Sequence, residues 1–554
     1  MNRRHFLKNF SATAAVTPFA VNGFSMRPFA NSHILNVLNS CEEVADRVLI
    51  LIQLKGGNDG LNTLVPLDQY PDYAKLRETI KIPDSGPAKY LNLDTTLPLK
   101  DQIGLHPVLS SLKELYDKGW ANIVQGVGYE NIDQSHFKGA DIWLSGGDNS
   151  LEKYNIHTGW PGRALNAMYP KVKGAPIPEM LYPLGIQIGD PNPSLGFHTD
   201  TEHRNSINLS GQDPEGFYSL IQTIGGAPLA TIPNSEYGTE LAYIMGVEKA
   251  VDLYSQYISE AFKAGTNAIS TYPQSSFAFQ LKTIARLIKG GCKTKVYLCS
   301  MGGFDTHGRQ IAAEGQITLG DHANRLQQLM DSVKTFLNDL NAMGLGEKVM
   351  ACTFSEFGRC AKENGSLGTD HGTLAPMFVF GKSAAAGVRG TNVNLKNLTS
   401  DNQLQGQQFD YRQVFTSILQ DWLGASNYVL EQTMFDGFAK IPVVGAPHVV
   451  SPDCYVGSVS TWGAGEPEKR LLSVSPNPAV TRTEVTYYSE YNFTARLTLH
   501  SLGGTLLQAH TVQVQPGINR YYLELRSVPA CTCFVRLESE AGKGDVVKLI
   551  VTRE

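Results

Sequence analysis

The sequence has little of three features that often settle a function: long apolar runs, an excess of one charge, and closely spaced cysteines. After the N-terminal segment, no stretch reaches the ~18 apolar residues of a membrane-spanning helix. The formal net charge is only -5, which gives no sign of a nucleic-acid partner. Eight cysteines among 554 residues are too sparse for a disulfide scaffold, and no pair has zinc-ribbon spacing.

What remains is a globular composition, with 18% charged and 42% hydrophobic residues. A chain of 554 residues is too long for one ordinary domain and long enough for a large core. The 53 glycines and 28 prolines indicate many turns and long loops. The sequence therefore predicts a globular protein of more than one domain.

The first 30 residues have the pattern of an export signal. Arg3 and Arg4 precede Phe6-Leu7-Lys8, and a modest apolar run, Phe10 to Ala20, follows. The paired arginines resemble a twin-arginine signal, and an ordinary Sec signal is the alternative. Either route takes the protein out of the cytoplasm, so we expect it in the periplasm in transit. We expect no membrane-spanning segment in the mature chain.

Residues 45–445 alternate between apolar strands and amphipathic helices. Val48 to Leu54 is an unbroken apolar run, as expected for a strand buried on both faces. Residues 295–300 and 349–354 repeat this pattern and flank a helix whose apolar positions recur every three or four residues. This alternation predicts an α/β domain with a doubly wound, mostly parallel sheet. Between about 175 and 290 the pattern loosens, and we expect an inserted helical and loop cap over the sheet.

The last part of the chain has a different composition. Residues 446–469 contain Ser, Gly and Pro without a period and are interpreted as a linker. From 470 to 554, short alternating segments are separated by turns such as Leu502-Gly503-Gly504. This pattern predicts a small all-β sandwich.

Polar side chains capable of chemistry follow several predicted strands. The carboxyl ends of parallel strands meet at one edge of the sheet, where ligands bind in open α/β folds. Several carboxylates gathered at one edge repel one another unless a cation neutralises them, so a divalent metal is expected. A metal would let Ser135 or a water act as a nucleophile at neutral pH. The candidate groups are Asp59, Ser135-His136, Asp305 with His307, Glu356, and Asp370-His371.

Two of these residues also have a purely structural interpretation. Asn58-Asp59-Gly60 is favourable turn chemistry, so Asp59 could serve only the turn. Ser135 could cap a helix that starts at His136. The sequence alone leaves both interpretations open.

Three later residues have structural alternatives as well. Glu356 could simply pair with Arg359, and His371 could be a satisfied loop histidine. His322 lies early in an amphipathic helix and is expected to be a surface or capping residue. Convergence of the other groups at one edge is what favours a functional site.

Six motifs, in this order along residues 45–440, resemble the family catalogued as domain of unknown function 1501. That family looks like a branch of the alkaline phosphatase and sulfatase superfamily. The resemblance implies an alkaline-phosphatase-like fold, a two-metal hydrolase ancestry and twin-arginine export. The motifs are Gly56-Gly57-Asn58-Asp59-Gly60-Leu61-Asn62, Ser135-His136-Phe137, Gly159-Trp160 with Arg163, Gly303-Phe304-Asp305-Thr306-His307, Ser355-Glu356-Phe357-Gly358-Arg359 and Thr369-Asp370-His371-Gly372.

The resemblance assigns roles to individual residues. Asp59 matches the superfamily's first metal aspartate, and Ser135 falls where the nucleophile is expected. Asp305 and His307 occupy the place of an Asp/His metal pair, with a shorter spacing than the usual Asp-x-x-x-His. Phe357 stands where many members have a histidine, which removes one expected ligand.

The later motifs can be aligned with the superfamily's metal ligands in two ways. In the first, Glu356 is a ligand and His371 supplies the later metal histidine; in the second, Asp370-His371 is the Asp-His pair and Glu356 supports it. We favour the first, because Glu356 directly follows a strand. The predicted metal is zinc, or else calcium, magnesium or manganese. The predicted metal ligands are Asp59, Asp305, His307, Glu356, Asp370 and His371, with Asn58, His136 and Arg359 in support.

The C-terminal residues resemble a second family, the sorting domains of type IX secretion. The resemblance covers about 470–554 and implies the type IX machinery as a partner, passage across the outer membrane, and surface attachment or release. Cys531-Thr532-Cys533-Phe534 replaces the more usual Gly-x-Tyr turn. The motifs are Val474-Ser475-Pro476-Asn477-Pro478, Leu502-Gly503-Gly504 and the ending Val546 to Thr552.

Two functions follow as expectations. In the first, the protein is an exported metal-dependent hydrolase of phosphate or sulfate esters, in which a metal at Asp59 and Glu356 activates Ser135. A second metal, at Asp305, His307 and His371, would then hold the anion. In the second, the protein keeps the hydrolase fold and acts as a non-catalytic surface or binding protein. Phe357 and the short Asp-x-His spacing motivate this alternative.

Overall fold

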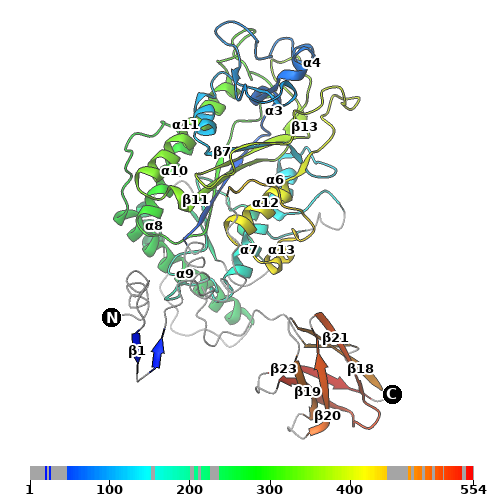
Figure 1. Ribbon diagram of the computed structural model, residues 1–554. Coiled ribbons are helices and arrows are strands. Elements are labelled where there is room, and N and C mark those ends of the chain that lie inside the picture. The colour runs from blue at the N-terminus through cyan, green and yellow to red at the C-terminus, as the bar shows by residue number, and fades with distance from the viewer. Residues whose placement is uncertain are drawn as a thin grey trace. The chain divides into compact units, whose positions relative to one another are not determined.

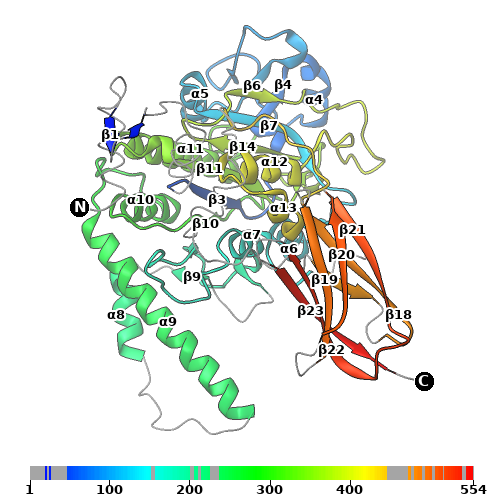
Figure 2. The same ribbon diagram turned by 60° about the horizontal axis from the view of Figure 1, so that its bottom comes forward.

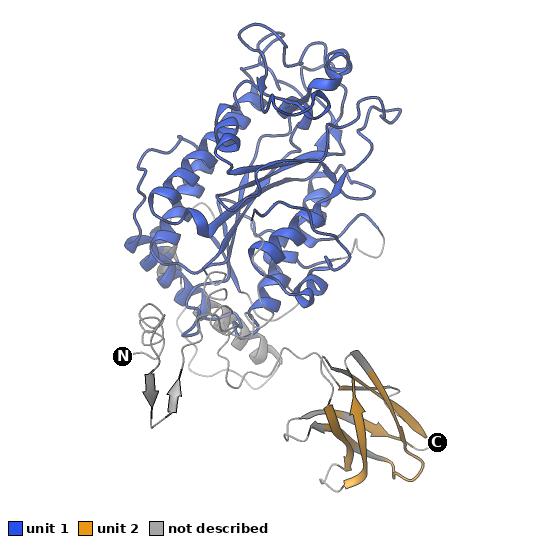
Figure 3. Cartoon of the chain, viewed as in Figure 1, with its two compact units in different colours: residues 1–461 blue, residues 462–554 orange. Residues whose placement is uncertain are grey.

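The chain forms two compact units, residues 1–461 and 462–554, which are described separately (Figure 3). Most of the predicted export signal and the whole predicted linker 446–469 lie outside the described residues. Within the signal, only the short strands β1 (Phe19–Val21) and β2 (Phe24–Met26) are described. The computed structural model describes residues 19–21, 24–26, 46–150, 156–199, 205–209, 214–224, 236–445, 472–475, 479–489, 493–501, 506–515, 517–539 and 544–552.

The centre of the first unit is a nine-stranded sheet of order β15-β7-β14-β11-β3-β10-β8-β9, with β16 beside β7. Every neighbouring pair is parallel except the two that β14 makes with β11 and β7. This confirms a mostly parallel sheet. The strands are β3 (Val48–Leu54), β7 (Ala121–Gly128), β8 (Gly185–Ile188), β9 (Ser206–Leu209), β10 (Val296–Met301), β11 (Val349–Ser355), β14 (Ala375–Phe380), β15 (Gly387–Arg389) and β16 (Phe409–Asp410).

Helices cover both faces of this sheet (Figures 1 and 2). All seven residues of β3 are buried, and they alternate between two cores. Ile50 and Ile52 pack in one core with residues of α5 (Ser110–Asp117), α9 (Glu236–Ala264), α10 (Ser276–Lys289) and α11 (Asp321–Ala342). Leu49 and Leu51 pack in the other with α6 (His136–Ser145), α7 (Trp160–Met168), α12 (Tyr411–Ser417) and α13 (Asn427–Thr433). The unbroken apolar strands thus correctly predicted burial on both faces.

Shorter elements complete the first unit. A three-stranded sheet has the order β4-β6-β5, and β12 pairs with β13. These elements are α3 (Gly60–Thr63), β4 (Leu64–Pro66), α4 (Tyr70–Leu76), β5 (Leu91–Asn92), β6 (Ile103–Leu105), α8 (Pro214–Ile224), β12 (Gly358–Arg359) and β13 (His371–Gly372), with 3-10 turns at Leu67–Gln69, Leu99–Asp101, Leu195–Phe197 and Gly346–Lys348 and a π turn at Ile418–Trp422.

The predicted cap over residues 175–290 needs correction. Strands β8 and β9 lie in this region and extend the central sheet in parallel with β10. Helix α10 packs its buried side against one face of the same sheet. Each of these strands has four residues, too few to show a period between Gly- and Pro-rich loops. The helical part of the expectation is met by α9, which spans 29 residues of this region.

The second unit consists of two antiparallel sheets of orders β17-β18-β21 and β20-β19-β22-β23, as the alternating segments predicted. Apolar residues from both sheets share one core. The structure does not test a role in secretion. The strands are β17 (Leu472–Ser475), β18 (Arg482–Ser489), β19 (Phe493–Ser501), β20 (Leu506–Val514), β21 (Gly517–Glu524), β22 (Cys531–Ser539) and β23 (Gly544–Val551).

Two features of the fold bear directly on function. Because β14 runs antiparallel to its neighbours, the residues that precede it lie at the edge where β3, β7, β10 and β11 end. Residues from five places in the sequence therefore reach one edge. In the part of the chain that is described, no helix combines the length and apolarity that crossing a membrane requires.

Candidate functional site

The loops after β3 and β10 lie against each other and form the floor of the site. Gly56 and Gly57 follow β3 with φ of +115° and +81°, a region that favours glycine. A Cβ at Gly56 would lie 2.3 Å from the Asp305 backbone nitrogen, and one at Gly57 would lie 2.5 Å from the Phe357 ring. Only glycine lets these loops approach so closely, which brings Asp305 beside the residues that follow β11.

Asp305 lies at the centre of a group of three histidines and one arginine. His136 Nε2 is 3.4 Å from its Oδ2, while His307 Nε2 and His371 Nε2 are 3.2 and 3.3 Å from its Oδ1. Arg359 Nη2 donates a hydrogen bond of 2.7 Å to the same Oδ1. The Asp305 side chain is 46% exposed, so the group opens to solvent. We call Asp305, His136, His307 and His371 the Asp305 cluster.

Two of the histidines are held so that a lone pair faces Asp305. His371 Nδ1 lies 2.8 Å from the carbonyl oxygen of Gln134, which can only accept, so Nδ1 carries the hydrogen. Burial and the neighbouring Arg359 lower the pKa of His371, so the ring is neutral at pH 7. Its Nε2 lone pair then faces a carboxylate oxygen, a repulsive contact that a cation between them would turn into an attraction.

His136 shows the same arrangement with a different anchor. Its Nδ1 is 2.9 Å from Glu356 Oε2, which also accepts a 2.8 Å hydrogen bond from the Gly56 amide. Burial raises the pKa of Glu356, although His136 and the Gly56 amide act in the opposite direction. In the neutral tautomer that donates Nδ1 to Glu356, His136 presents a lone pair on Nε2 to Asp305.

These contacts fit a metal ion. His136, Asp305 and His371 each offer one ligand atom, and the three atoms lie within 4.8 Å of one another. Ligands at about 2.0–2.1 Å from a tetrahedral ion are about 3.3–3.4 Å apart. Each observed imidazole–carboxylate separation, 3.4 Å from His136 to Oδ2 and 3.3 Å from His371 to Oδ1, is close to that spacing. Metal-binding histidines ordinarily donate their other nitrogen to a carbonyl or carboxylate, as both rings do.

Arg359 fixes the loops that carry the cluster. It is buried, and its guanidinium donates to the backbone carbonyls of Gly56, Gly57, Phe304 and Thr369. Burial opposes ionisation of Asp305, but the hydrogen bond and charge of Arg359 outweigh it and lower the pKa of that carboxyl. The alternative in which Glu356 simply pairs with Arg359 is therefore wrong, because Arg359 contacts Asp305.

Asp59 is not brought into this group. Its Oδ2 accepts from Arg77 Nη1 at 2.5 Å and from Gln310 Nε2 at 2.6 Å, and its Oδ1 accepts from the Leu61 amide at 3.2 Å. Both charged side chains are 0% exposed. Burial opposes ionisation of Asp59, but Arg77 more than compensates and lowers the pKa. The structure thus gives Asp59 a buried ion pair, and its place as a metal ligand stays a prediction.

Asn58 and His322 extend this buried network. His322 Nε2 lies 3.1 Å from Asn58 Oδ1, and Thr63 donates to the same oxygen at 3.3 Å. His322 is buried, so the prediction of a surface or capping residue is wrong. Burial lowers its pKa to about 4 and that of nearby His106 to about 3, so both rings are neutral at pH 7.

The remaining predicted residues lie around the rim. Ser135 is the N-cap residue of α6 and is exposed, but its side chain makes no capping hydrogen bond. His307 Nδ1 is 3.2 Å from Asp370 Oδ1, which also accepts from Asn364 Nδ2 at 3.0 Å. The Asn364 hydrogen bond lowers the pKa of Asp370. Asp370 thus orients His307.

Phe357 takes part in the cluster by packing. Its buried ring lies 4.4 Å from the His371 ring and 5.1 Å from the His136 ring, centroid to centroid. It therefore fixes the planes of both imidazoles. The sequence predicted only a supporting role for His136. The Gln134 carbonyl that orients His371 could not be predicted, because a backbone group leaves no signal in the sequence.

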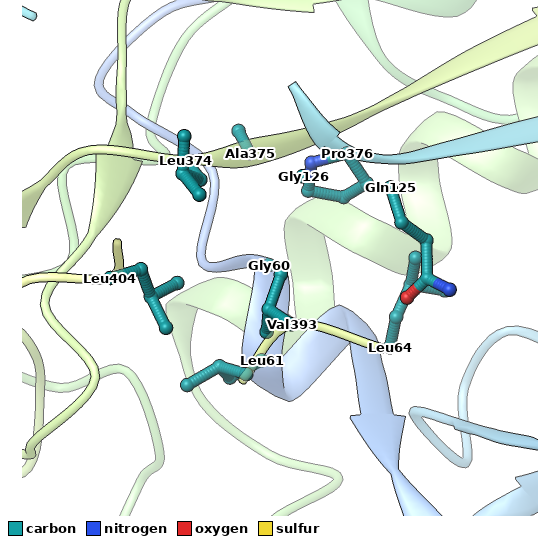
Figure 4. Close-up of a pocket in the computed structure, with 10 residues that line it drawn as sticks. All are labelled: Gly60, Leu61, Leu64, Gln125, Gly126, Leu374, Ala375, Pro376, Val393 and Leu404. Carbon is teal, nitrogen blue, oxygen red and sulfur yellow. The ribbon is translucent and has the colours of Figure 1, made fainter. Parts of the chain in front are cut away.

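A small cavity near the site is not large enough to hold a substrate. Its volume is about 20 Å³, which is room for about one water molecule. Figure 4 shows the mainly apolar side chains around it, among them Leu61, Leu64 and Leu404, with the Gln125 amide beside them. The exposed Asp305 cluster is therefore the better candidate for chemistry.

Comparisons with known proteins give one family match over part of the chain and some distant structural likenesses. The family described as "Protein of unknown function (DUF1501)" matches residues 226–414. None of the curated proteins that were compared matches the sequence.

Three solved structures illustrate the structural likeness. The lipoteichoic acid synthase LtaP from Listeria monocytogenes is 9% identical, with 74% of this chain and 82% of that chain covered and a TM-score of 0.33. The PsFucS1 sulfatase from Pseudoalteromonas sp. is 12% identical, with 91% and 90% covered and a TM-score of 0.30. A protein in the alkaline phosphatase superfamily from Vibrio parahaemolyticus is 9% identical, with 94% and 92% covered and a TM-score of 0.26.

Proposed function

We propose that this protein is an exported, metal-dependent hydrolase of phosphate or sulfate esters and that the Asp305 cluster is its active site. One observation carries the proposal. Two imidazoles, His136 and His371, are anchored through Nδ1 and direct Nε2 toward the same carboxylate at 3.4 and 3.3 Å. A divalent cation held by His136, Asp305 and His371 resolves the repulsion in this arrangement.

The metal, when bound, would polarise the ester and lower the pKa of a water molecule. The protein's own groups hold this geometry. Glu356 fixes His136, the Gln134 carbonyl fixes His371, and Arg359 fixes Asp305. These supports keep the three donors close together and ready for a cation.

His307 is placed to move a proton. Its ring is 46% exposed, and its two nitrogens contact Asp305 and Asp370 at 3.2 Å each. An imidazole in solvent reach can donate a proton to a departing alcohol oxygen and recover it from water. Ser135 lies one residue before His136 on the exposed start of α6, and its hydroxyl is the protein nucleophile we propose.

The substrate class and destination rest on the sequence. The order of the six motifs resembles the phosphatase and sulfatase superfamily, which supports a phosphate or sulfate ester. The paired Arg3 and Arg4 support export through the twin-arginine or Sec machinery. The C-terminal motifs support the type IX machinery as a second partner and the cell surface or medium as the destination.

Metal content and hydrolysis test the proposal together. The full chain, loaded with Zn²⁺ and dialysed, should retain about one equivalent and hydrolyse 4-nitrophenyl phosphate or 4-nitrophenyl sulfate. His371→Ala should lose both, whereas His198→Ala, an exposed histidine outside the cluster, should lose neither. Retention of less than about a tenth of an equivalent by the unaltered protein, or full activity of H371A, would contradict the proposal.

A second candidate function has its own supporting observation. Asp59, which matches the superfamily's first metal aspartate, is committed to Arg77, and Phe357 fills the place of another expected ligand. A site with fewer ligands suits a surface protein that binds an anion or metal without catalysis. Metal retention with no hydrolysis of either ester, and with phosphate binding that depends on the metal, would favour this candidate.

A further inference from the structure

A larger pocket lies beside the Asp305 cluster, at the carboxyl ends of β3, β8 and β10. Its volume is about 280 Å³, just below the range of about 300–1,000 Å³ that is usual for pockets that hold small molecules. Its wall is formed mainly by charged and polar side chains. They include Lys55, Asp190, Ser275, Gln280, Arg325 and Gln328.

Two loops that line the pocket lead along the chain to the cluster. Lys55 precedes Gly56, whose amide donates to Glu356, and the Lys55 carbonyl accepts from the Phe304 amide at 3.1 Å. Gly302 lines the pocket three residues before Asp305. A molecule reacting at Asp305 could therefore extend into this pocket.

The pocket carries a net positive charge. Lys55 forms an ion pair with Asp190, which leaves the charge of Arg325 without a carboxylate among the lining residues. The start of α10 also lines this pocket. Ser275 is its N-cap, and the Ser275 hydroxyl oxygen accepts a 3.1 Å hydrogen bond from the Ala278 amide. The first turn of α10 contains no acidic residue. A helix N-terminus adds partial positive charge to that of the arginine.

Arg325 is held in place, but only part of its guanidinium group makes hydrogen bonds. A Cβ at Gly303 would lie 2.4 Å from its Nε, so the guanidinium lies directly over the loop that carries Asp305. Its Nη1 donates to Gln328 at 3.1 Å, and its Nε is buried without a hydrogen-bond partner in the described part of the chain. Nη2 makes no hydrogen bond with the described residues and is the donor left for a ligand. Guanidinium groups with free donors are suited to carboxylate, phosphate and sulfate oxygens.

We propose that this pocket binds the alcohol part of the substrate and that this part is polar and carries a second anionic group, which Arg325 recognises. The proposal rests on the proposed hydrolysis at Asp305 and narrows its substrate class. It distinguishes a doubly charged polar ester from a lipid or simple aryl ester, because the lining polar groups would lose their solvation against an apolar ligand.

Binding without turnover tests the pocket separately from the reaction. D-Glucuronate, a polar carboxylate, is titrated into the metal-free full chain by calorimetry, with D-glucose as the uncharged control. Glucuronate should bind at least tenfold more tightly than glucose. Arg325→Met should weaken glucuronate binding at least tenfold, Arg325→Lys less, and Arg309→Met, which removes an exposed guanidinium elsewhere, should leave it within twofold. Equal binding by wild type and R325M, or no binding by wild type, would overturn the proposal.

A kinetic comparison separates this inference from the proposed function. With 3-carboxyphenyl phosphate and phenyl phosphate, R325M should raise KM at least tenfold for the first ester only, with kcat unchanged. Hydrolysis of both esters with equal KM in wild type and R325M would overturn the pocket and leave the hydrolase standing. Arg325-dependent glucuronate binding with no hydrolysis of any ester would support the pocket and remove the hydrolase.

Discussion

Asp59 and Asp305 look alike in the sequence and differ completely in the structure. Each follows a buried parallel strand and a pair of glycines, after β3 in one case and after β10 in the other. Asp59 is 0% exposed and paired with Arg77, whereas Asp305 is 46% exposed among three imidazoles. The comparison shows that a strand-end carboxylate acquires its role from its neighbours.

The largest expected effect is on the buried pair. Arg77→Met leaves the Asp59 charge buried without a charged partner, which should cost about 3–5 kcal/mol of unfolding free energy. Arg309→Met, at a pair whose arginine is 83% exposed, should cost less than about 1 kcal/mol. Urea unfolding of both variants measures the difference, and a cost of R77M below about 1 kcal/mol would break the contrast between the two aspartates.

The second effect concerns metal binding at the exposed carboxylate. Asp305→Asn should weaken Zn²⁺ binding at least 100-fold, about 2.7 kcal/mol, because it removes one of three ligands. Asp59→Asn should leave the Zn²⁺ dissociation constant within about threefold, since Asp59 contacts Arg77 and Gln310. Competition with a chromogenic chelator measures both constants below the unfolding temperature. Equal weakening by the two variants would place Asp59 in the metal site after all.

A smaller effect on Zn²⁺ affinity is expected at Glu356, which contacts His136. Glu356→Gln should weaken Zn²⁺ binding about 10–100-fold, the usual consequence of losing a carboxylate that orients a ligand. Glu347→Gln, an exposed residue paired with Lys382, is the matched control and should change it less than twofold. A loss as large as that of D305N would make Glu356 a direct ligand, as the sequence favoured.

The last prediction is a slope, the change of the unfolding free energy with pH that the buried network behind Asp59 produces. Burial lowers the pKa of His322 to about 4 and that of His106 to about 3, below the unfolded value of about 6.5. Below pH 6.5 the unfolded state therefore binds more protons than the folded state. The stability of the folded state relative to the unfolded state falls as the pH falls from 6.5 toward 4. Each histidine should lower the unfolding free energy by about 1.4 kcal/mol per pH unit in that window. His322→Gln should reduce the slope, and an unchanged slope would contradict the assignment.

The sequence was sufficient for the strands and the main helices because their patterns are local. β3, β10 and β11 are unbroken apolar runs, and α11 repeats its apolar positions every three or four residues. β8 and β9 were missed because four residues carry too little periodicity.

The sequence predicted that the candidate residues converge at one edge of the sheet, but it could not rank them. Asp305, His307, Glu356 and His371 do meet at one edge. The partner of Asp59 could not be found, because Arg77 directly follows α4, in a segment without a functional motif. The antiparallel direction of β14, which brings His371 to this edge, could not be predicted either. An apolar run has the same pattern in a parallel and in an antiparallel strand.

X-ray absorption spectroscopy of the Zn²⁺-loaded full chain tests the central claim most directly. The account predicts one site with two imidazole nitrogens at about 2.0–2.1 Å and a carboxylate oxygen, with one imidazole lost in His371→Ala. A spectrum without imidazole scattering, or one that H371A leaves unchanged, would contradict it.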